Sequence, residues 1–330
     1  MPGHDIIVIG ASAGGVDALS QLVAGLPADL AAAIFIVLHI PADSRSRLPE
    51  VLQRATRLPT AHAVDGEPVL PGRVYVAPPD LHMLLDQEHV RVVPGPKENR
   101  ARPALDPLFR SAAHSYGARV VGVVLTGVLD DGTAGLLAIR MHGGIAIVQD
   151  PEEALFADMP RSALENVGAD HCLPVHEIPK VLTRLAASPA DSSKELTAMS
   201  LEISVDEDQK FKQHGRASVY TCPECHGTLW ELEEGNIKRF RCRIGHAFSP
   251  LSLEAEQNRA LDELLWAALR ALEENAAMME QLGNQAFERT DASSSVRFKR
   301  RAQERLQQAD TMRQLLIGNP GDEPPELSTG

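Results

Sequence analysis

The chain has 330 residues, 44% of them hydrophobic and 23% charged, which predicts a globular protein of about two or three units with a sizeable core. Its formal net charge of −13 argues against broad, sequence-independent nucleic-acid binding, because such binding depends on neutralising phosphates. No apolar run approaches the roughly 20 residues that span a bilayer, so we expect a cytoplasmic protein without membrane insertion.

Residues 1–183 alternate short β-branched runs with longer helical patterns, which is typical of a parallel sheet with crossover helices. The expected strands are near-continuous apolar runs that suit burial on both faces, at residues 5–10, 32–39, 120–127 and 144–150. Residues 73–95 consist instead of shorter extended runs joined by turns. We expect this segment to form an antiparallel hairpin appended to the sheet.

The remaining chain divides into four segments. Residues 184–215 are rich in Ser, Ala and charged residues and lack a sustained period, which predicts a linker. Residues 216–250 hold a cysteine cluster, residues 251–318 carry two helical patterns, and residues 319–330 form a tail.

The two helical patterns predict a helical hairpin, because turn and N-cap residues, "TDASSS", separate them. Each pattern has an apolar stripe at helical spacing. The stripes comprise Leu261, Leu265, Ala268, Leu272 and Met279 in the first helix, and Phe298, Ala302, Ala309, Met312 and Leu316 in the second. Such stripes are more typical of packing between the two helices than of a dimer interface, but both alternatives stay open at this point.

The stretch "IGASAGG" places Gly10, Ser12 and Gly14 at a turn between a strand-like run and a helix-like one. It lacks the middle glycine of a dinucleotide-binding turn and the lysine of a phosphate-binding loop. It matches Gly-x-Ser-x-Gly, in which a serine is exposed at the end of a sheet and the following helix directs N–H groups toward a developing oxyanion. The alternative is a tight turn that contains a small residue. The presence of a partner base would distinguish a nucleophilic serine from such a turn.

Further polar residues follow predicted buried strands, at the edge where ligands bind in an open parallel sheet. His39 ends the run "AAIFIVLH", and Asp130 and Asp131 follow the run "VVGVVLTG". A strand-end histidine is often structural, and an Asp-Asp-Gly turn often contains one helix-capping and one solvated aspartate. Beside Ser12, however, His39 is the leading candidate for a base, and the loop supplies a candidate acid.

The segment "CPECHGTLWELEEGNIKRFRCRIGHAF" contains Cys222-x2-Cys225 and, after an intervening stretch, Cys242-x3-His246. Three thiolates and an imidazole form a common tetrahedral set for structural Zn²⁺, and clustered cysteines in a cytosolic chain favour metal binding over disulfides. His226 is a less natural fourth ligand because it adjoins Cys225. The alternative is a small β unit with reduced cysteines and with His246 in solvent. We expect a closed, noncatalytic zinc site.

Several motifs, in order from residue 5 to about 180, closely resemble the catalytic domain of the CheB protein-glutamate methylesterase family. They are "IGASAGG", "VLHIP", "VLPGRVYVAPPDLHM", "NRARPALDPLF", "GVVLTGVLDDGTAG" and "MPRSALENVGAD". The resemblance implies a doubly wound αβα sandwich and a Ser-His-Asp carboxylic ester hydrolase. It further implies action on γ-glutamyl methyl esters of methyl-accepting chemoreceptors and deamidation of certain receptor glutamines.

The resemblance also implies which residues carry the reaction. The serine of the family's Gly-Ala-Ser motif corresponds to Ser12, and the histidine of its His-x-Pro strand end corresponds to His39. The family's aspartate directly precedes the glycine of its loop, which selects Asp131 over Asp130.

Three departures from the family pattern bear on function. Val128 stands where methionine is common, and Leu38 stands where a polar residue can occur, which implies altered substrate fit more than lost chemistry. Typical family enzymes begin with a phosphorylatable receiver domain, whereas the catalytic strand here is expected to start at Asp5. We therefore expect that domain to be missing and the esterase activity to be independent of phosphodonors.

Two hypotheses follow from the sequence. The first is a methylesterase whose C-terminal part docks it to a receptor array or a signalling protein. In that case, deletion of residues 184–330 leaves turnover of a small ester similar or higher. The second is a catalytically weak adaptor or scaffold protein that uses the cysteine-rich module and the helical hairpin. The serine, histidine and aspartate favour the enzyme, and methanol release from methylated receptor distinguishes the two.

Overall fold

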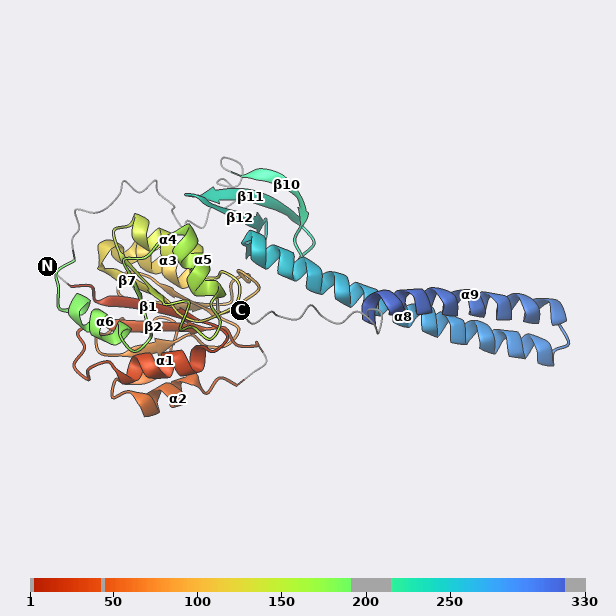
Figure 1. Cartoon of the computed structure of the whole chain (residues 1–330), viewed down its shortest axis with the longest axis horizontal. Helices are drawn as coiled ribbons and strands as arrows, with labels where there is room; N and C mark the ends of the chain where they lie inside the picture. Colours follow the sequence, from red (N-terminus) through yellow and green to blue (C-terminus); the bar gives the residue numbers. More distant parts are fainter. Residues whose placement is uncertain (1–2, 43–44, 191–214, 318–330) are drawn as a thin grey trace. The chain divides into compact units, whose positions relative to one another are not determined.

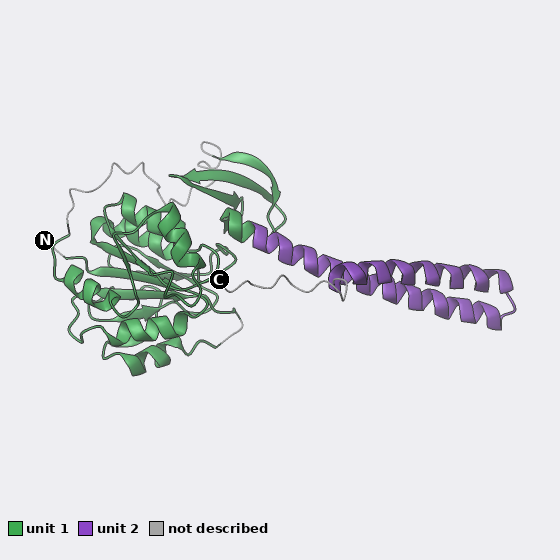
Figure 2. Ribbon diagram, viewed as in Figure 1, with its two compact units in different colours: residues 1–253 green, residues 254–330 purple. Residues whose placement is uncertain are grey.

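The structure, a computed structural model, describes residues 3–42, 45–190 and 215–317. It divides into two compact units, Met1–Leu253 and Glu254–Gly330, which Figure 2 draws in different colours. The predicted tail and most of the predicted linker fall outside the described residues. At the start of that linker, helix α6 (Ile178–Ala186) continues past residue 183, where the first domain is expected to end.

Unit 1 is built around a seven-stranded parallel sheet (Figure 1). Its strand order is β3-β4-β2-β1-β7-β8-β9, so the chain starts in the middle and winds outward to one edge and then to the other. The strands are β1 (Ile6–Ala11), β2 (Ala33–Leu38), β3 (Thr60–His62), β4 (Val74–Val76), β7 (Val120–Val124), β8 (Ile145–Gln149) and β9 (His171–Leu173). This order places the carboxyl ends of β2, β1 and β7 next to one another.

Alternate side chains of the central strands pack against two separate helical layers, as Figure 1 shows. In β1, Ile7 and Ile9 join the core beneath one layer, whereas Ile6 and Val8 join the core beneath the other. The first layer consists of α1 (Gly15–Ala24), α2 (Leu48–Ala55) and α6, and the second consists of α3 (Leu105–Tyr116), α4 (Thr133–Met141) and α5 (Asp158–Asn166). Because both faces are covered, the strands are continuous apolar runs. The predicted doubly wound αβα sandwich is therefore confirmed.

The hairpin prediction for residues 73–95 is right in part and wrong in part. Strands β5 (His82–Leu85) and β6 (Val90–Val93) do form an antiparallel hairpin, but as a separate two-stranded sheet. Strand β4 belongs instead to the main sheet, where it pairs in parallel with β2 and all three of its side chains are buried. The short edge strands β3 and β9 were not predicted, because three partly exposed residues are too few to show a period.

Residues 216–250, which we call the β-module, form an antiparallel sheet within unit 1. Its strands are β10 (Arg216–Thr221), β11 (Thr228–Glu234), β12 (Ile237–Cys242) and β13 (Ala247–Phe248). Gly235, at φ +62°, and Asn236 form the two-residue turn between β11 and β12, which suits the twist of a tight hairpin. The buried side chains of Leu229, Phe240 and Phe248 form a small core with Cys222 and Cys242.

Helices α8 (Pro250–Glu288) and α9 (Ala292–Ile317) form a helical hairpin. The carboxylate of Asp291 accepts a hydrogen bond from the N–H of Ser294 (3.0 Å) and thereby caps α9. Ala302 and Ala309, from one of the predicted stripes, are buried. Leu261, from the other stripe, is 55% exposed, so it is not buried by packing within the hairpin.

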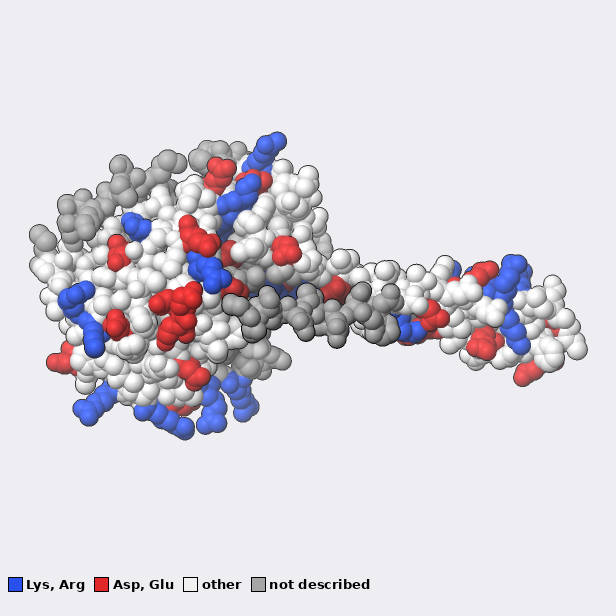
Figure 3. All heavy atoms as spheres, in the orientation of Figure 1, with Lys and Arg blue, Asp and Glu red and all other residues white. Residues whose placement is uncertain are grey.

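Within the described ranges, no helix is both long and apolar enough to cross a membrane. On the face drawn in Figure 3, Lys and Arg side chains are interspersed with Asp and Glu side chains. Such a mixture of signs is typical of a solvated surface and offers the phosphates of a nucleic acid little net attraction on that face.

Candidate active site

Ser12 follows β1 directly, at the carboxyl edge of the parallel sheet. Its N–H donates to the carbonyl oxygen of Thr126 (3.0 Å), which ties the turn to the chain leaving β7. Gly14 precedes α1 at φ +73°, a left-handed conformation that favours glycine. Gly127 is constrained by space, because a Cβ there would lie 2.8 Å from the Cβ of Ser12. The two glycines thus allow Ser12 to sit at the N-terminus of α1, where a helix favours negative charge.

His39 is the first residue after β2, and its N–H donates to the carbonyl oxygen of Ala11 (3.2 Å). Its imidazole lies between two partners, with Nδ1 3.2 Å from Ser12 Oγ and Nε2 2.7 Å from Asp131 Oδ2. An ionised carboxylate can only accept, so Nε2 carries the proton and the lone pair of Nδ1 faces Ser12. In this tautomer the imidazole can take the serine proton.

Asp131 is 2% exposed, and its carboxylate accepts hydrogen bonds from several donors besides His39. They are the N–H of Leu105 to Oδ2 (2.7 Å), Asn99 Nδ2 to Oδ1 (2.8 Å) and the N–H of Gly132 to Oδ1 (2.9 Å). Burial acts to raise the pKa of Asp131, but the hydrogen bond and charge of His39 and the N–H of Leu105 hold this pKa below its ordinary value. The carboxylate is therefore ionised at neutral pH and can stabilise an imidazolium.

Asp130 precedes Asp131 in the loop but has a different partner. Its Oδ1 accepts a hydrogen bond from Ser249 Oγ of the β-module (2.6 Å). Burial raises the pKa of the Asp130 carboxyl. The structure therefore brings Asp131, rather than Asp130, to His39, and neither aspartate of this turn is simply solvated.

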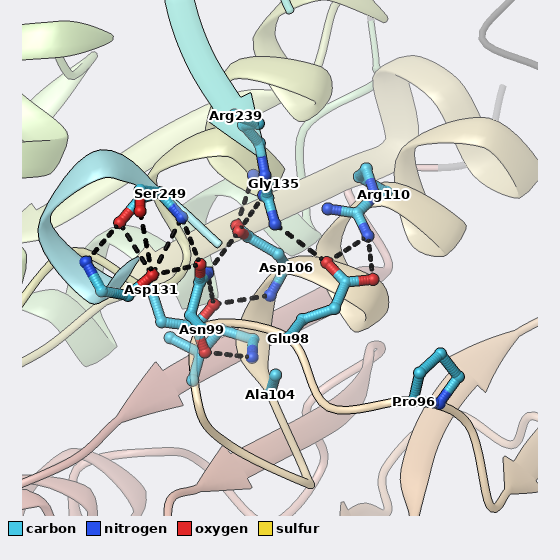
Figure 4. A network of polar contacts seen from close by, with 12 residues as sticks. Pro96, Glu98, Asn99, Ala104, Asp106, Arg110, Asp131, Gly135, Arg239 and Ser249 are labelled. Carbon is cyan, nitrogen blue, oxygen red and sulfur yellow. Dashed lines mark hydrogen bonds and ion pairs between the residues drawn. The ribbon is translucent and has the colours of Figure 1, made fainter. Parts of the chain in front are cut away.

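Asn99, Asp106 and Arg239 extend this network, although none was singled out from the sequence (Figure 4). Asn99 Nδ2 donates to Asp131 Oδ1 (2.8 Å) and to Asp106 Oδ2 (2.9 Å). Asp106 is 1% exposed and also contacts the guanidinium of Arg239 on β12. The motif "NRARPALDPLF" contains both Asn99 and Asp106, so it is the sequence signal that could have pointed to these two residues. No sequence signal pointed to Arg239, since it lies in the β-module, far along the chain from these residues.

A second cluster of functional side chains lies in the β-module. Cys222, Cys225, Cys242 and His246 each place a ligand atom within 4.8 Å of the others. The separations are 3.5 Å from Cys225 Sγ to Cys242 Sγ, 3.5 Å from Cys242 Sγ to His246 Nδ1, and 3.7 Å from Cys222 Sγ to His246 Nδ1. A tetrahedral ion with bonds of about 2.0–2.3 Å sets its ligands roughly 3.5–3.8 Å apart. The four residues therefore have the spacing of metal ligands.

Two backbone turns hold these ligands. The N–H of Cys222 donates to the carbonyl oxygen of Gly227 (2.7 Å), and the N–H of Cys242 donates to that of His246 (2.9 Å). Each turn thereby brings its two ligands to one side. His246 Nδ1 faces the thiols, whereas His226 is exposed and lies outside the cluster.

Comparison with known proteins gives a consistent result for the parallel-sheet part of the chain. Residues 7–182 match a family model described as CheB methylesterase. A Ralstonia nicotianae protein named protein-glutamate methylesterase/protein-glutamine glutaminase is 40% identical over 187 residues, which are 55% of this chain and 49% of that protein. A Leptospira interrogans relative is 38% identical over 183 residues, which are 55% of this chain and 95% of the relative. The chain thus spans about half the length of the Ralstonia protein.

A solved structure agrees with these sequence matches. The crystal structure of the Thermotoga maritima CheB methylesterase catalytic domain has a TM-score of 0.54 and 36% sequence identity, over 56% of this chain and 100% of that one. The resemblance carried by the sequence motifs is thereby confirmed. Since the family model matches residues 7–182, more than half of the chain, this chain belongs to the CheB methylesterase family.

Proposed function

We propose that this chain is a protein-glutamate methylesterase, which hydrolyses γ-glutamyl methyl esters of methyl-accepting chemoreceptors. The observation that carries the proposal is the series of contacts from Ser12 Oγ through the imidazole of His39 to the carboxylate of Asp131. Membership of the family supports the ester as the substrate class.

In the proposed reaction, Ser12 Oγ attacks the ester carbonyl carbon while His39 Nδ1 accepts the serine proton. Asp131 stabilises the resulting imidazolium, and the N-terminus of α1 favours the oxyanion. His39 then donates the proton to the methoxy oxygen, so that methanol leaves and an acyl-enzyme remains. Water, activated by His39, attacks the acyl carbon and releases the glutamate side chain and Ser12.

The same residues can act on a glutamine side chain. Attack on the amide carbonyl, with proton donation from His39 to the nitrogen, would release ammonia and give the same acyl-enzyme. The name of the Ralstonia nicotianae relative pairs the two activities. We therefore include receptor glutamine deamidation in the proposed function.

Methanol release from a methylated receptor tests the proposal. Ser12→Ala should lower this release by several orders of magnitude, because the members of a triad act as a unit. Ser20→Ala is the matched control, since the Ser20 hydroxyl bonds the carbonyl oxygen of Val16 within α1. Absence of methanol release from the unaltered chain would instead favour the adaptor or scaffold hypothesis.

We further propose that the β-module binds one structural Zn²⁺ through Cys222, Cys225, Cys242 and His246. The ligand types and their separations support this assignment. Four protein ligands complete a tetrahedral shell, so the site would be closed and noncatalytic. The few apolar side chains of the β-module core are a further reason for a metal, whose binding would contribute to folding.

Elemental analysis of protein purified without chelator tests the metal site. The expected content is one zinc per chain, and Cys225→Ser should remove it. Cys172→Ser is the matched control, because Cys172 is an exposed cysteine outside the cluster. Protein without stoichiometric metal would contradict the assignment.

A further inference from the structure

The β-module supplies a cation to buried acids beside the triad. Arg239 is 3% exposed, and its guanidinium contacts Asp106 and, through Nη2, Glu98 Oε2 (3.0 Å). Figure 4 shows this side chain reaching from β12 to the two carboxylates. A guanidinium buried so deeply is stable only when carboxylates neutralise it. Burial acts to lower the pKa of Arg239, but Asp106 and its acidic neighbours hold this pKa above its ordinary value.

The carboxylate that Arg239 contacts shares hydrogen-bond donors with Asp131. Asn99 Nδ2 donates to both carboxylates, at 2.9 Å to Asp106 Oδ2 and 2.8 Å to Asp131 Oδ1. The N–H of Gly132 does the same, at 3.1 Å to Asp106 Oδ1 and 2.9 Å to Asp131 Oδ1. Two carboxylates this close repel each other, which favours protonation of one of them. An opposing charge is needed if both are to stay ionised.

Arg239 is placed to provide that charge. Burial raises the pKa of Asp106 to about 6, the guanidinium of Arg239 opposes this shift, and the charge of Asp131 adds to it. Arg110 contacts Glu98 directly (2.6 Å), so Glu98 has a second cation at contact distance. Loss of the Arg239 guanidinium would therefore act mainly on Asp106 and, through the shared donors, on Asp131.

We propose that Arg239 is a positioning residue of the triad, which neutralises Asp106 so that Asp131 keeps its charge and its hydrogen bond to His39. On this view the β-module is part of the esterase site and not only an appended docking element. For its activity readout, the inference rests on the proposed esterase function.

A set of hydrogen bonds from residues 247–252 also supports the Asp131 carboxylate, because it orients the side chain of Asn99. The N–H of Ser249 donates to Asn99 Oδ1 (3.0 Å), as does Ser252 Oγ (3.2 Å), and the N–H of Asn99 donates to the carbonyl oxygen of Ala247 (2.8 Å). These bonds orient the Asn99 amide, with its oxygen toward residues 249–252 and its NH₂ group toward Asp106 and Asp131. The segment that follows β12 thus fixes the shared donor, while Arg239 balances the charge.

The charged and titratable groups around Asp106 and Asp131 come from several elements. They are His39 after β2, His82 of β5, Glu98 before α3, Arg110 of α3, Asp130 in the loop after β7 and Arg239 of β12. Together with Asp106 and Asp131 themselves, Glu98 and Asp130 make four carboxyl groups against the two arginines, so removal of one guanidinium favours proton uptake. The pair of aspartates should then titrate at higher pH.

The test compares Arg239→Met, Arg239→Lys and Lys238→Met in the full chain. Lys238 precedes Arg239 on β12, its side chain is 50% exposed, and it pairs with Glu231. Its loss therefore removes a cation from the same strand but leaves the contacts of Glu98 and Asp106 with Arg239 in place. The substrate is a peptide that carries one glutamate γ-methyl ester. The readouts are kcat as a function of pH and the pH range over which the downfield proton resonance of His39 Nε2–H persists.

Arg239→Met should lower kcat at neutral pH by about tenfold or more. The acid limb of its pH profile and the loss of the resonance should both move to higher pH by about one pH unit or more, because an adjacent opposite charge changes a carboxyl pKa by about 1–3. Arg239→Lys should restore most of the lost kcat and return the acid limb and the resonance most of the way to their original pH. Lys238→Met should match the unaltered chain. Identical profiles and resonances for Arg239→Met and Lys238→Met would overturn the proposal.

Two further comparisons keep the outcome decisive. If Arg239→Met does not fold, as judged by circular dichroism, Arg239→Gln is compared with Arg239→Lys, because glutamine keeps a hydrogen-bond donor at this position without the positive charge. A higher acid limb in Arg239→Gln than in Arg239→Lys supports the role of Arg239, and equal limbs overturn it. If the unaltered chain releases no methanol, the proposed function fails, whereas the resonance titration still tests Arg239.

Discussion

The Asp131 carboxylate is ionised in a buried site because donors reach it from separate segments of the chain. His39 follows β2, Leu105 begins α3, and Gly132 follows Asp131 in the same loop. Backbone N–H groups make up much of this set, so the fold itself stabilises the charge. Asp130, the preceding residue, meets Ser249 instead. Adjacent aspartates thus have different environments, because successive side chains of a loop point in different directions.

Substitution of the two aspartates separates their roles. Asp131→Asn should lower methanol release by about 10⁴-fold, because an amide cannot hold the same imidazole tautomer or stabilise the imidazolium. Asp130→Asn should be mild, since the amide oxygen can still accept the hydrogen bond from Ser249 Oγ. Steady-state assays of both variants check the expectation. It would be contradicted if Asp130→Asn were the more damaging change.

Gly127→Ala tests the space beside the serine. The new Cβ would lie 2.1 Å from Met159 Sδ and 2.8 Å from the Cβ of Ser12, so the turn must shift. A displacement of about 1 Å at the reacting atoms can lower kcat by about 10²-fold. Gly66→Ala is the control, because its Cβ would meet nothing within 4 Å, although its φ of +77° makes the substitution strained. Gly66→Ala should therefore lower the melting temperature but not kcat, and equal losses of kcat would argue against a steric effect at Ser12.

Strand β12 serves two sites because successive side chains of a strand point to opposite faces. Phe240 and Cys242 join the core of the β-module, and Cys242 belongs to the ligand cluster. Arg239 lies on the other face, toward Glu98 and Asp106. The position and direction of one strand therefore connect the proposed metal site to the proposed esterase site.

The helical hairpin offers a test of packing at the scale of the element. Ala302 of α9 is 5% exposed, so Ala302→Asp would bury a carboxylate and should destabilise the hairpin by about 2 kcal/mol or more. Gln303→Asp places the same residue at the exposed neighbouring position and is the matched control. Thermal unfolding followed by circular dichroism should show a lower transition temperature for Ala302→Asp only. Turnover of a small ester should be unchanged in both, because these residues belong to the second compact unit.

At the scale of the molecule, the β-module and the parallel sheet belong to one compact unit. They are joined by the ion pair of Lys97 with Glu224 (2.9 Å), the hydrogen bond from Asn236 Nδ2 to the carbonyl oxygen of Asn166 (2.8 Å) and the contact of Arg239 with Asp106. The expectation that deletion of residues 184–330 leaves small-ester turnover similar or higher therefore needs revision. The deletion would remove Arg239 from the buried acids, and we now expect lower turnover.

Removal of the proposed metal should have the same consequence in the intact chain. A chelator should disorder β12, because Cys242 ends that strand, and should lower methanol release while most helical circular dichroism remains. Added Zn²⁺ should restore both the β-module and turnover. Cys172→Ser protein should respond to the chelator as the unaltered chain does. Full activity in protein shown to be metal-free would contradict the connection between the two sites.

Much of the fold was predictable from local patterns. The central strands are apolar runs flanked by turn residues, and such runs reflect burial on both faces of a sheet, whatever the distant contacts are. The short strands β3 and β9 were missed because three partly exposed residues carry little pattern. Strand β4 was assigned to a hairpin because pairing partners depend on strand order, which no local pattern records.

The sequence by itself determined the fold class, the family and the residue types of both candidate sites, because each of these depends on residues close together in the chain. The Gly-x-Ser-x-Gly turn, the strand-end His39 and the Cys-x-x-Cys spacing are examples. Only the tertiary structure decided that Arg239 meets Asp106, a partner 133 residues away, and that Ser249 binds Asp130. Charge compensation between buried groups acts over a few ångströms in space, and the folding of distant segments alone brings such groups within that range.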